Sequence, residues 1–421
     1  MRLQVFDVDY RTDPLRIRLF GKNSEGVFKL LDSEFRPYFY AVPEEDTGEI
    51  EKDLEEKDFT SDKREDLEII DFEVVEVKDG LESIDVVKVY VDVPATVTKL
   101  KNELWDLESV SHCREFDIPF YRRYLIDKEL RPGSWVEIEG DHQESEKFES
   151  EIEVQDIRPS ESSGDLQWKS LAFDLEVIDE DIVMASFYSE KFRKVLSLKD
   201  TDLEFVEEVE DQAEMLERFI EIVEDQKADI LLGYNTDEFD FDILRDKADE
   251  TGVTLALGRN GERMKFNRRG RFKGARIKGR MHLDLYPFVT HVLAPGIDSE
   301  TLDLDSVAQE MLGKEKDDLS WSEMKQIWRE KGDIEKFAEY ALKDSELTYQ
   351  LGEQISPQIL ELSKITGLIP FDTCRLTYGQ LTENYLLREA YSRNMLSRNR
   401  PSQKKRSKRD REQAYTGGFV Y

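Results

Sequence analysis

The chain has 421 residues and a formal net charge of −34, because 94 Asp and Glu residues outnumber 60 Lys and Arg residues. Its 23 Phe, 16 Tyr and 5 Trp exclude a disordered polypeptide, and its length suffices for two or three domains that each bury a core. An apolar run of 18 residues, a signal-peptide core and closely spaced cysteines are all missing, so we expect a cytoplasmic protein without a membrane span or a cysteine-based site.

The first 130 residues predict a mostly β domain. Segments rich in Val, Ile, Phe and Tyr are typical of strands, and they lie at Leu3–Tyr10, Leu15–Phe20, Tyr38–Val42, Leu67–Val77 and Asp85–Val93. Glu, Asp and Ser dominate the following segment Gly140–Glu153. We interpret this segment as an exposed loop or edge and as a plausible domain boundary.

Strands and helices alternate from Leu171 onwards. Short apolar runs predict strands at Leu171–Val177, Ile182–Tyr188 and Asp229–Gly233. Apolar residues at helical spacing predict helices at Glu214–Glu224, Asp240–Glu250, Ser320–Glu330, Ile334–Ile355, Ile359–Ile365 and Gly379–Asn394. This alternation indicates an α/β domain around a mixed sheet, and the chain as a whole is α+β.

The net charge affects which kind of partner the chain can bind. A chain at −34 should be repelled by nucleic acid, unless it works in very high salt, where the Debye length falls to roughly 3 Å near 1 M. Two segments reverse the sign: Arg259–Arg280 has ten Lys or Arg and one acid, and Arg398–Arg411 has eight and one. Each is either an exposed basic loop, hairpin or tail, or a contact for a polyphosphate backbone.

Paired carboxylates on predicted strands and helices give the most specific signal. Asp174 and Glu176 are two residues apart on a strand and therefore share a face, which is unfavourable unless a cation joins them. Asp240 follows a predicted strand and turn, while Tyr340 and Asp344 share one helical face at i and i+4. Oxygen ligands without His suit Mg²⁺ or Mn²⁺. Each pair alone is also compatible with an ordinary surface.

The order and context of these acids resemble the proofreading 3′→5′ exonuclease domain of family B DNA polymerases, especially the archaeal replicative type. The three motifs of that domain correspond to Phe-Asp-Leu-Glu at 173–176, Tyr-Asn-Thr-Asp-Glu-Phe-Asp-Phe at 234–241 and Tyr-x-x-x-Asp at 340–344. Val177 departs from the Thr that often follows the first motif. The stretch 278–286 is also similar to the family, and the basic segment 259–280 falls where these enzymes carry a hairpin beside the primer–template.

The resemblance implies an RNase H-like fold and two-metal hydrolysis of phosphodiester bonds. Asp174 would bridge two Mg²⁺ or Mn²⁺ ions, Glu176 and Asp344 would complete one metal site, and Asp240 would complete the other, directly or through water.

Three further residues would act on the substrate and the attacking water. Tyr340 would orient the water, whereas Asn235 and Phe239 would hold the frayed 3′ end by hydrogen bonding and stacking. The product would be a 5′-nucleotide.

The resemblance extends towards the N-terminus, where residues 7–10, 35–38 and 116–127 resemble the archaeal N-terminal domain that captures template uracil. Aromatic and apolar walls can hold a flipped-out base. The matching positions are Tyr10, Pro37, Tyr38, Val97, Phe120 and Arg123. The same side chains are also compatible with an ordinary core.

Near the C-terminus, Tyr415-Thr-Gly417-Gly418 matches the Tyr-x-Gly-Gly motif that contacts the template strand in this family. The palm motif with Ser-Leu-Tyr-Pro-Ser is absent, and Asp200-Thr-Asp202 lies among the wrong neighbours to be the other palm motif. We therefore expect an N-terminal portion without palm, fingers and thumb, which incorporates no nucleotide alone. A split-gene subunit, an intein-interrupted half and a truncation remain alternatives.

The expected organisation is an N-terminal uracil-sensing-like domain at 1–133, the exonuclease domain at 134–355, a helical segment at 356–396 that packs back on the N-terminal domain, and a basic linker with the start of the polymerase domain at 397–421. The expected partners are primer–template DNA, a single-stranded 3′ end, the missing polymerase half and, as a further candidate, a sliding clamp. A non-catalytic DNA-binding or uracil-sensing scaffold and an unrelated stand-alone nuclease are the competing interpretations. The acidity favours a salt-accumulating organism.

Overall fold

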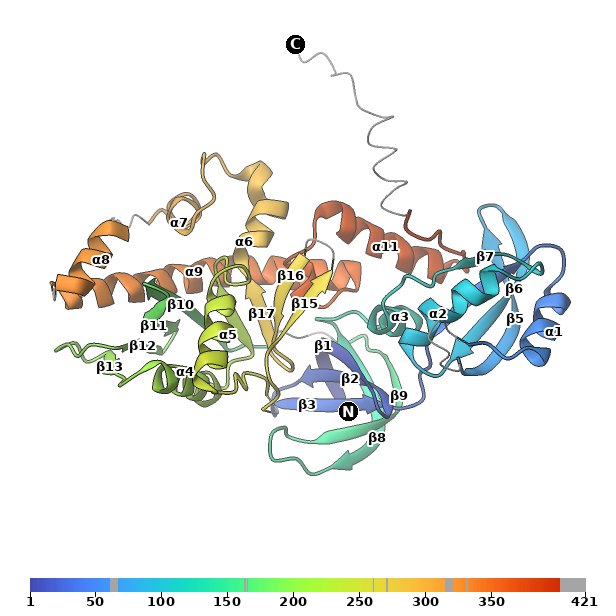
Figure 1. Ribbon diagram of the computed structural model, residues 1–421, viewed down its shortest axis with the longest axis horizontal. Coiled ribbons are helices and arrows are strands. Elements are labelled where there is room, and N and C mark those ends of the chain that lie inside the picture. The colour runs from blue at the N-terminus through green and yellow to red at the C-terminus, as the bar shows by residue number, and fades with distance from the viewer. Residues whose placement is uncertain are drawn as a thin grey trace, which may run out of the picture. The chain divides into compact units, whose positions relative to one another are not determined.

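The computed structural model describes residues 1–60, 67–162, 164, 166–259, 261–269, 272–314, 321–330 and 332–401 (Figure 1). The chain divides into two compact units. Unit 1 comprises Met1–Tyr10, Ile17–Ser33 and Lys128–Tyr385, and unit 2 comprises Arg11–Arg16, Glu34–Asp127 and the chain from Leu386 onwards. The expected template contacts Tyr415, Gly417 and Gly418 lie outside the described residues.

Unit 1 contains a closed β-barrel built from two distant parts of the sequence. Its strands, in spatial order, are β1 (Arg2–Thr12), β2 (Leu15–Lys22), β3 (Val27–Asp32), β9 (Glu151–Pro159) and β8 (Trp135–Gln143). The two ends of the segment predicted as an exposed loop or edge at 140–153 belong to strands β8 and β9, which pair with His142 opposite Ile152. Ile152 and Val154 alternate with polar residues and are buried, and Ile157 is buried further along β9.

The centre of unit 1 is a six-stranded mixed sheet. Its strands, in spatial order, are β13 (Val206–Glu208), β12 (Phe192–Ser197), β11 (Asp181–Ser189), β10 (Ser170–Ile178), β14 (Ile230–Gly233) and β17 (Met281–Asp284). Strand β10 pairs antiparallel with β11 and parallel with β14. The predicted mixed α/β architecture is confirmed.

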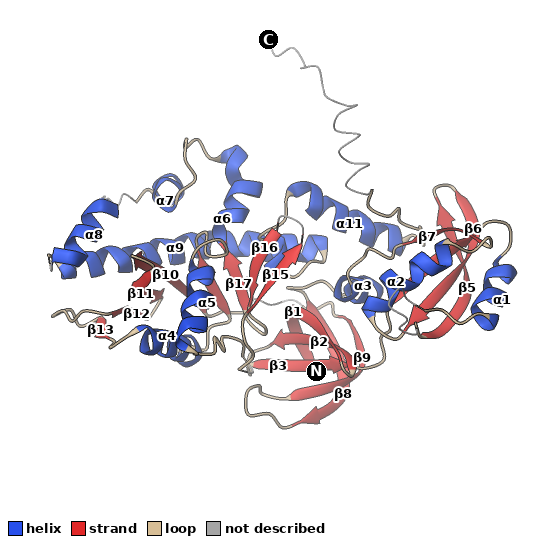
Figure 2. Cartoon of the chain, in the orientation of Figure 1, coloured by secondary structure: helices blue, strands red, loops and turns tan. Residues whose placement is uncertain are grey.

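Helices cover both faces of this sheet (Figure 2). On one face, α4 (Gln212–Asp225) and α5 (Asp240–Thr251) share an apolar core with Phe173 and Phe187. On the other face, α9 (Ile334–Thr366) packs Leu347 and Leu351 against the sheet. A Cβ atom at Gly352 would lie 2.3 Å from Leu232, so this glycine lets α9 approach the sheet closely.

The remaining elements of unit 1 connect these layers. They are the hairpin β15 (Lys265–Arg269) and β16 (Phe272–Arg276), the short helices α6 (Leu285–Phe288), η1 (Val289–Leu293), η2 (Ala294–Gly296) and α10 (Pro370–Thr373), and the helices α7 (Leu304–Leu312), α8 (Trp321–Glu330) and α11 (Tyr378–Ser392). The predicted separate helix at Ile359–Ile365 is the last part of α9.

Unit 2 is a four-stranded sheet with helices against it. The strand order is β5 (Ile69–Asp79), β6 (Glu82–Val91), β4 (Tyr38–Pro43) and β7 (Val110–Arg114), and the helices are α1 (Thr47–Glu56), α2 (Pro94–Trp105) and α3 (Phe120–Asp127). The chain after α11 returns to this unit, where the Asn399 side chain binds the backbone of Cys113 and Glu115. In the described ranges, the helices are all too short or too polar to cross a bilayer.

Candidate metal centre

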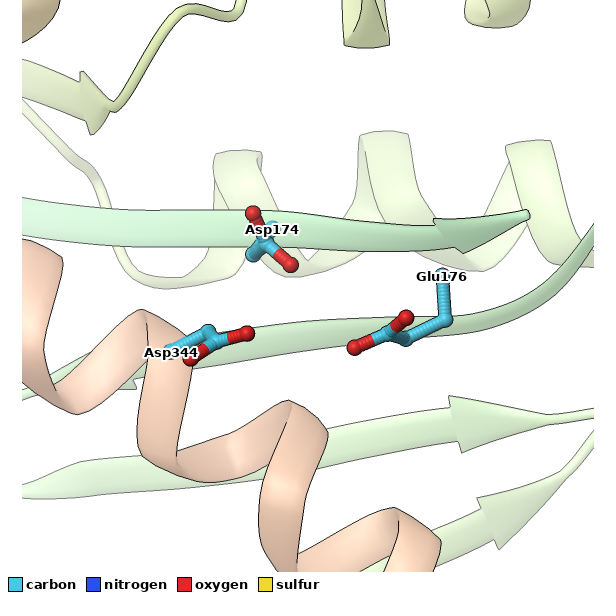
Figure 3. Close-up of side chains that lie close together, drawn as sticks. All are labelled: Asp174, Glu176 and Asp344. Carbon is cyan, nitrogen blue, oxygen red and sulfur yellow. The ribbon is translucent and has the colours of Figure 1, made fainter. Parts of the chain in front are cut away.

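Three carboxylates from two elements converge in unit 1 (Figure 3). Asp174 and Glu176 are two residues apart on β10 and so point to the same side of the sheet, where α9 presents Asp344. One oxygen from each carboxylate lies within 4.8 Å of the others. Asp344 is buried, and Asp174 and Glu176 are half-buried. Three like charges this close are favourable only when a cation neutralises them, so the donor set fits a hard divalent ion.

A buried pair of hydroxyl groups ties α9 to the sheet beside these acids. The Oγ atoms of Ser186 and Ser345 are 2.5 Å apart, and both side chains are buried. Ser186 on β11 lies opposite Asp174 in the strand register, and Ser345 follows Asp344 on α9. The hydrogen bond therefore helps to fix the spacing between the strand carboxylates and the helix carboxylate. The sequence alone offered no signal for this pair.

The fourth predicted ligand, Asp240, is not among the three clustered carboxylates of the described chain. It begins α5 and is buried, and burial raises its pKa to about 7. The backbone N–H groups of Leu175 and of Asp240 itself act in the opposite direction. Because Leu175 lies between Asp174 and Glu176, Asp240 adjoins the same strand, and a cation there would favour its ionised form.

Of the three residues predicted to handle water and substrate, Tyr340 lies on α9, and Asn235 and Phe239 lie in the connection between β14 and α5. Tyr340 is half-buried and lies one helical turn before Asp344 on α9. Asn235 adopts a left-handed conformation with φ of 65°, just after β14. Phe239 precedes α5 and is 65% exposed, so its ring is available for stacking.

Sequence reasoning assigned no role to a buried polar network below the second motif. Asp284, at the end of β17, accepts the backbone N–H of Asn235 at 2.7 Å and of Asp237 at 3.0 Å. Burial raises the pKa of Asp284 to about 7. Burial is the largest influence on Asp237 and opposes its ionisation, but the Arg375 guanidinium, His282 and the Ala275 N–H together outweigh it and lower the pKa of Asp237. The position of Asp284 at the end of a short apolar run was the one available signal.

Ion pairs occupy much of the basic segment 259–280. Among its described residues, five cations pair with carboxylates: Arg259 with Asp229, Lys273 with Asp242, Arg276 with Asp7, Lys278 with Asp9, and Arg280 with Glu224. These cations bind acids within unit 1, and the expected contact of this segment with a polyphosphate backbone stays a prediction. The hairpin β15–β16 is the part of the segment that extends as a separate ribbon.

Five of the six residues predicted for the uracil pocket belong to unit 2. Tyr10 lies in unit 1, and the other predicted positions, Pro37, Tyr38, Val97, Phe120 and Arg123, lie in unit 2. Those five are buried. Val97 belongs to the core between α2 and the sheet, whereas the ring of Tyr38 packs with Tyr40 and lies 4.8 Å from the Arg123 guanidinium.

A mixed sheet flanked by helices, with three carboxylates converging between β10 and α9, is an arrangement that suits metal-dependent hydrolysis of phosphodiester bonds. Residues 111–307 match the family model for the exonuclease domain of DNA polymerase family B. The chain is 33% identical to a DNA polymerase of Pyrococcus glycovorans and 31% identical to one of Thermococcus gorgonarius, in each case over 99% of this chain and 50% of the relative.

A solved structure extends the likeness. The family B DNA polymerase from the hyperthermophilic archaeon Pyrobaculum calidifontis superposes with a TM-score of 0.83 at 25% identity, over 96% of this chain and 52% of that one. Over nearly its whole length the chain is thus similar to archaeal family B DNA polymerases, and it spans about half the length of these relatives. Tyr340 and Asp344 lie beyond the residues that the family model matches.

Proposed function

We propose that this chain carries the 3′→5′ proofreading exonuclease of a replicative family B DNA polymerase, hydrolysing the terminal phosphodiester bond of a single-stranded 3′ end. The convergence of Asp174, Glu176 and Asp344 in one cluster carries this proposal. The likeness of residues 111–307 to the family exonuclease domain supports it independently.

In this proposal Asp174, Glu176, Asp240 and Asp344 hold two Mg²⁺ or Mn²⁺ ions. When bound, such ions stabilise the negative charge that develops on the attacking and leaving oxygens. Asp174 is the central ligand, because it shares a strand face with Glu176 and a cluster with Asp344, while Asp240 adjoins the next residue of the same strand.

The remaining roles belong to Tyr340, Asn235 and Phe239. The Tyr340 hydroxyl, one helical turn from Asp344, orients the attacking water. The exposed ring of Phe239 stacks on a terminal base, an interaction worth about 1–3 kcal/mol per base. The left-handed backbone of Asn235 turns the chain immediately after β14, and its side-chain amide binds the 3′ end.

The test follows degradation of 5′-labelled single-stranded DNA by the full chain with Mg²⁺ or Mn²⁺ in molar KCl. Asp174→Ala and Asp344→Ala should each lower the rate on the order of a thousandfold, because loss of a metal ligand removes several kcal/mol of transition-state stabilisation. Asp202→Ala, which removes an exposed acid of the same unit, should leave the rate unchanged. Undiminished hydrolysis in either ligand variant would refute the assignment.

The same relatives also support a proposal about the compartment and the partners of the chain. We propose that the chain works in the cytoplasm on primer–template DNA, with the polymerase half of the enzyme as its partner and a sliding clamp as a further one. The functional boundaries at residues 133, 355 and 396 are part of this proposal. The exposed Lys265 on the hairpin β15–β16 would contact the DNA backbone.

We also propose that unit 2 binds a template uracil base through its aromatic side chains. Phe120 stacks on Phe35 with ring centroids 5.5 Å apart, which leaves a rigid aromatic surface. Fluorescence anisotropy with otherwise identical uracil- and thymine-containing single strands tests this. Phe120→Leu should abolish the preference for uracil, and Phe116→Leu, which changes a core aromatic of the same unit, should retain it. Equal affinity of the unaltered chain for both strands would contradict the proposal.

A further inference from the structure

A buried ion pair joins the segment after α10 to the second motif. The Arg375 side chain, 1% exposed, donates from Nε to Asp237 Oδ2 at 2.6 Å and from Nη2 to Asp237 Oδ1 at 3.2 Å. The two residues are 138 positions apart in the sequence. Burying two charges is unfavourable unless their geometry and their other hydrogen bonds are good.

The remaining groups of this pair are satisfied. Arg375 Nη1 donates to the carbonyl oxygens of His282 and Phe371, each at 2.9 Å, and the Phe371 ring centroid lies 4.1 Å from the guanidinium. Asp237 Oδ1 also accepts the Ala275 N–H at 2.8 Å. The guanidinium is therefore held in a single orientation by elements on several sides.

The neighbouring strand leaves room for this side chain by means of a glycine. A Cβ atom at Gly274 on β16 would lie 2.9 Å from Arg375 Nε and 2.9 Å from the Phe371 ring. A larger residue would have to displace the guanidinium. The space that the Arg375 side chain occupies is thus formed by β16 as well as by the second motif.

The segment that the pair holds leads directly to the metal centre. Between β14 and α5, Asp237 is fixed by Arg375 through its side chain and by Asp284 through its N–H, and the Thr236 hydroxyl lies 3.0 Å from His282 Nε2. These contacts set the path of residues 235–239 and so the start of α5 at Asp240.

We propose that Arg375 is a positioning residue for the exonuclease site, acting through Asp237 to place Asn235, Phe239 and Asp240 against β10. This inference rests on the proposed function. Arg375 lies beyond the residues matched by the family exonuclease model, and it comes from a segment that the sequence predicted to pack on the N-terminal domain. A displacement of about 1 Å in a catalytic group lowers rates on the order of a hundredfold, so a distant anchor can control the chemistry.

The test compares Arg375→Met with Arg280→Met in the full chain. Arg280 is an equally buried arginine of unit 1, and its guanidinium binds Glu224 and the carbonyl oxygens of Ala228 and Leu257 rather than the second motif. Arg375→Met should lower the exonuclease kcat at saturating Mn²⁺ on the order of tenfold to a hundredfold relative to Arg280→Met. It should also accelerate hydrogen exchange of the backbone amides in residues 235–240.

A double-variant cycle separates positioning from general destabilisation. If Arg375 acts through Asp237, Asp237→Asn combined with Arg375→Met should lower kcat no further than the more damaging single change. Multiplied losses in the double variant, or equal losses in Arg375→Met and Arg280→Met, would overturn the inference. If Arg375→Met does not fold, Arg375→Lys takes its place, because lysine keeps the charge but cannot form the bidentate pair.

Hydrogen exchange makes the result independent of the proposed function. If the unaltered chain hydrolyses no DNA, the proposed function fails, yet exchange in residues 235–240 still reports on the anchor. Exchange that is as slow in Arg375→Met as in the unaltered chain would overturn the inference whatever the nuclease assay shows.

Discussion

Local spacing in the sequence was sufficient to predict some site residues, whereas others could be identified only from tertiary contacts. Asp174 and Glu176 share a face because strands alternate, and this rule needs only the sequence. Asp284 and Arg375, by contrast, contact the second motif across 49 and 138 positions. A buried aspartate or arginine looks like any surface charge in a chain with 94 acids, so only the fold distinguishes it.

His282 should make the protein less stable in acid. Burial and the neighbouring Arg375 lower its pKa to about 4 from 6.5, although Asp237 acts in the opposite direction. Between these two values the unfolded chain binds a proton that the folded chain does not bind. The free energy of unfolding should therefore fall as the pH drops from about 6.5 to about 4, by about 3 kcal/mol in total from this residue.

Urea unfolding followed by circular dichroism at successive pH values measures this effect. His282→Asn removes the titrating group, so its stability should depend less steeply on pH than that of the unaltered chain across the same window. Only the difference in slope matters, because the substitution also changes packing. Parallel curves for the two proteins would show that His282 contributes nothing to the acid sensitivity.

At the scale of elements, periodicity predicted the helices and strands of the nuclease sheet well. The strands β10, β11 and β14 and the helices α4 and α5 lie within a few residues of their predicted bounds. The barrel was harder, because β1, β2 and β3 close with β8 and β9 from more than 100 residues later. A domain boundary placed at residue 133 separates β1, β2 and β3 from β8 and β9, and the structure joins all five strands in one barrel.

Helix α9 shows how packing overrides a local signal. Pro357 lies inside it, and the sequence predicted two helices on either side of this residue. The structure has one helix of 33 residues instead. Ile355 and Ile359, which flank the proline, are both fully buried in the core of unit 1. Burial of this apolar face offsets the missing hydrogen bond at Pro357, so the helix that carries Asp344 also extends beyond the nuclease sheet.

At the scale of the whole molecule, the acids behind the net charge of −34 fall into two groups, those that pair with cations inside the fold and those on the surface. Buried or half-buried cations pair with acids inside unit 1, as in Arg18 with Asp9 and Glu262. The excess acids therefore lie mainly on the surface, where they repel each other. Composition alone could not separate these populations, because ion pairing depends on contacts such as that between residues 18 and 262.

This surface charge leads us to expect that salt stabilises the chain. Raising KCl from 0.1 M to 2 M shortens the Debye length from about 10 Å to about 3 Å or less and so weakens repulsion among the surface acids. The urea midpoint, measured by circular dichroism, should rise on the order of 1 M, and nuclease activity should follow the folded fraction. Urea is uncharged, so it leaves the ionic strength unchanged during the titration.

Sucrose distinguishes screening from general solvent exclusion. Sucrose also favours the compact state, but it carries no charge and does not shorten the Debye length. If repulsion among the surface acids is the cause, KCl should raise the midpoint well above the value reached in sucrose at matched osmolality. A midpoint that is the same in 0.1 M and 2 M KCl would show that the net charge does not limit the stability of this fold.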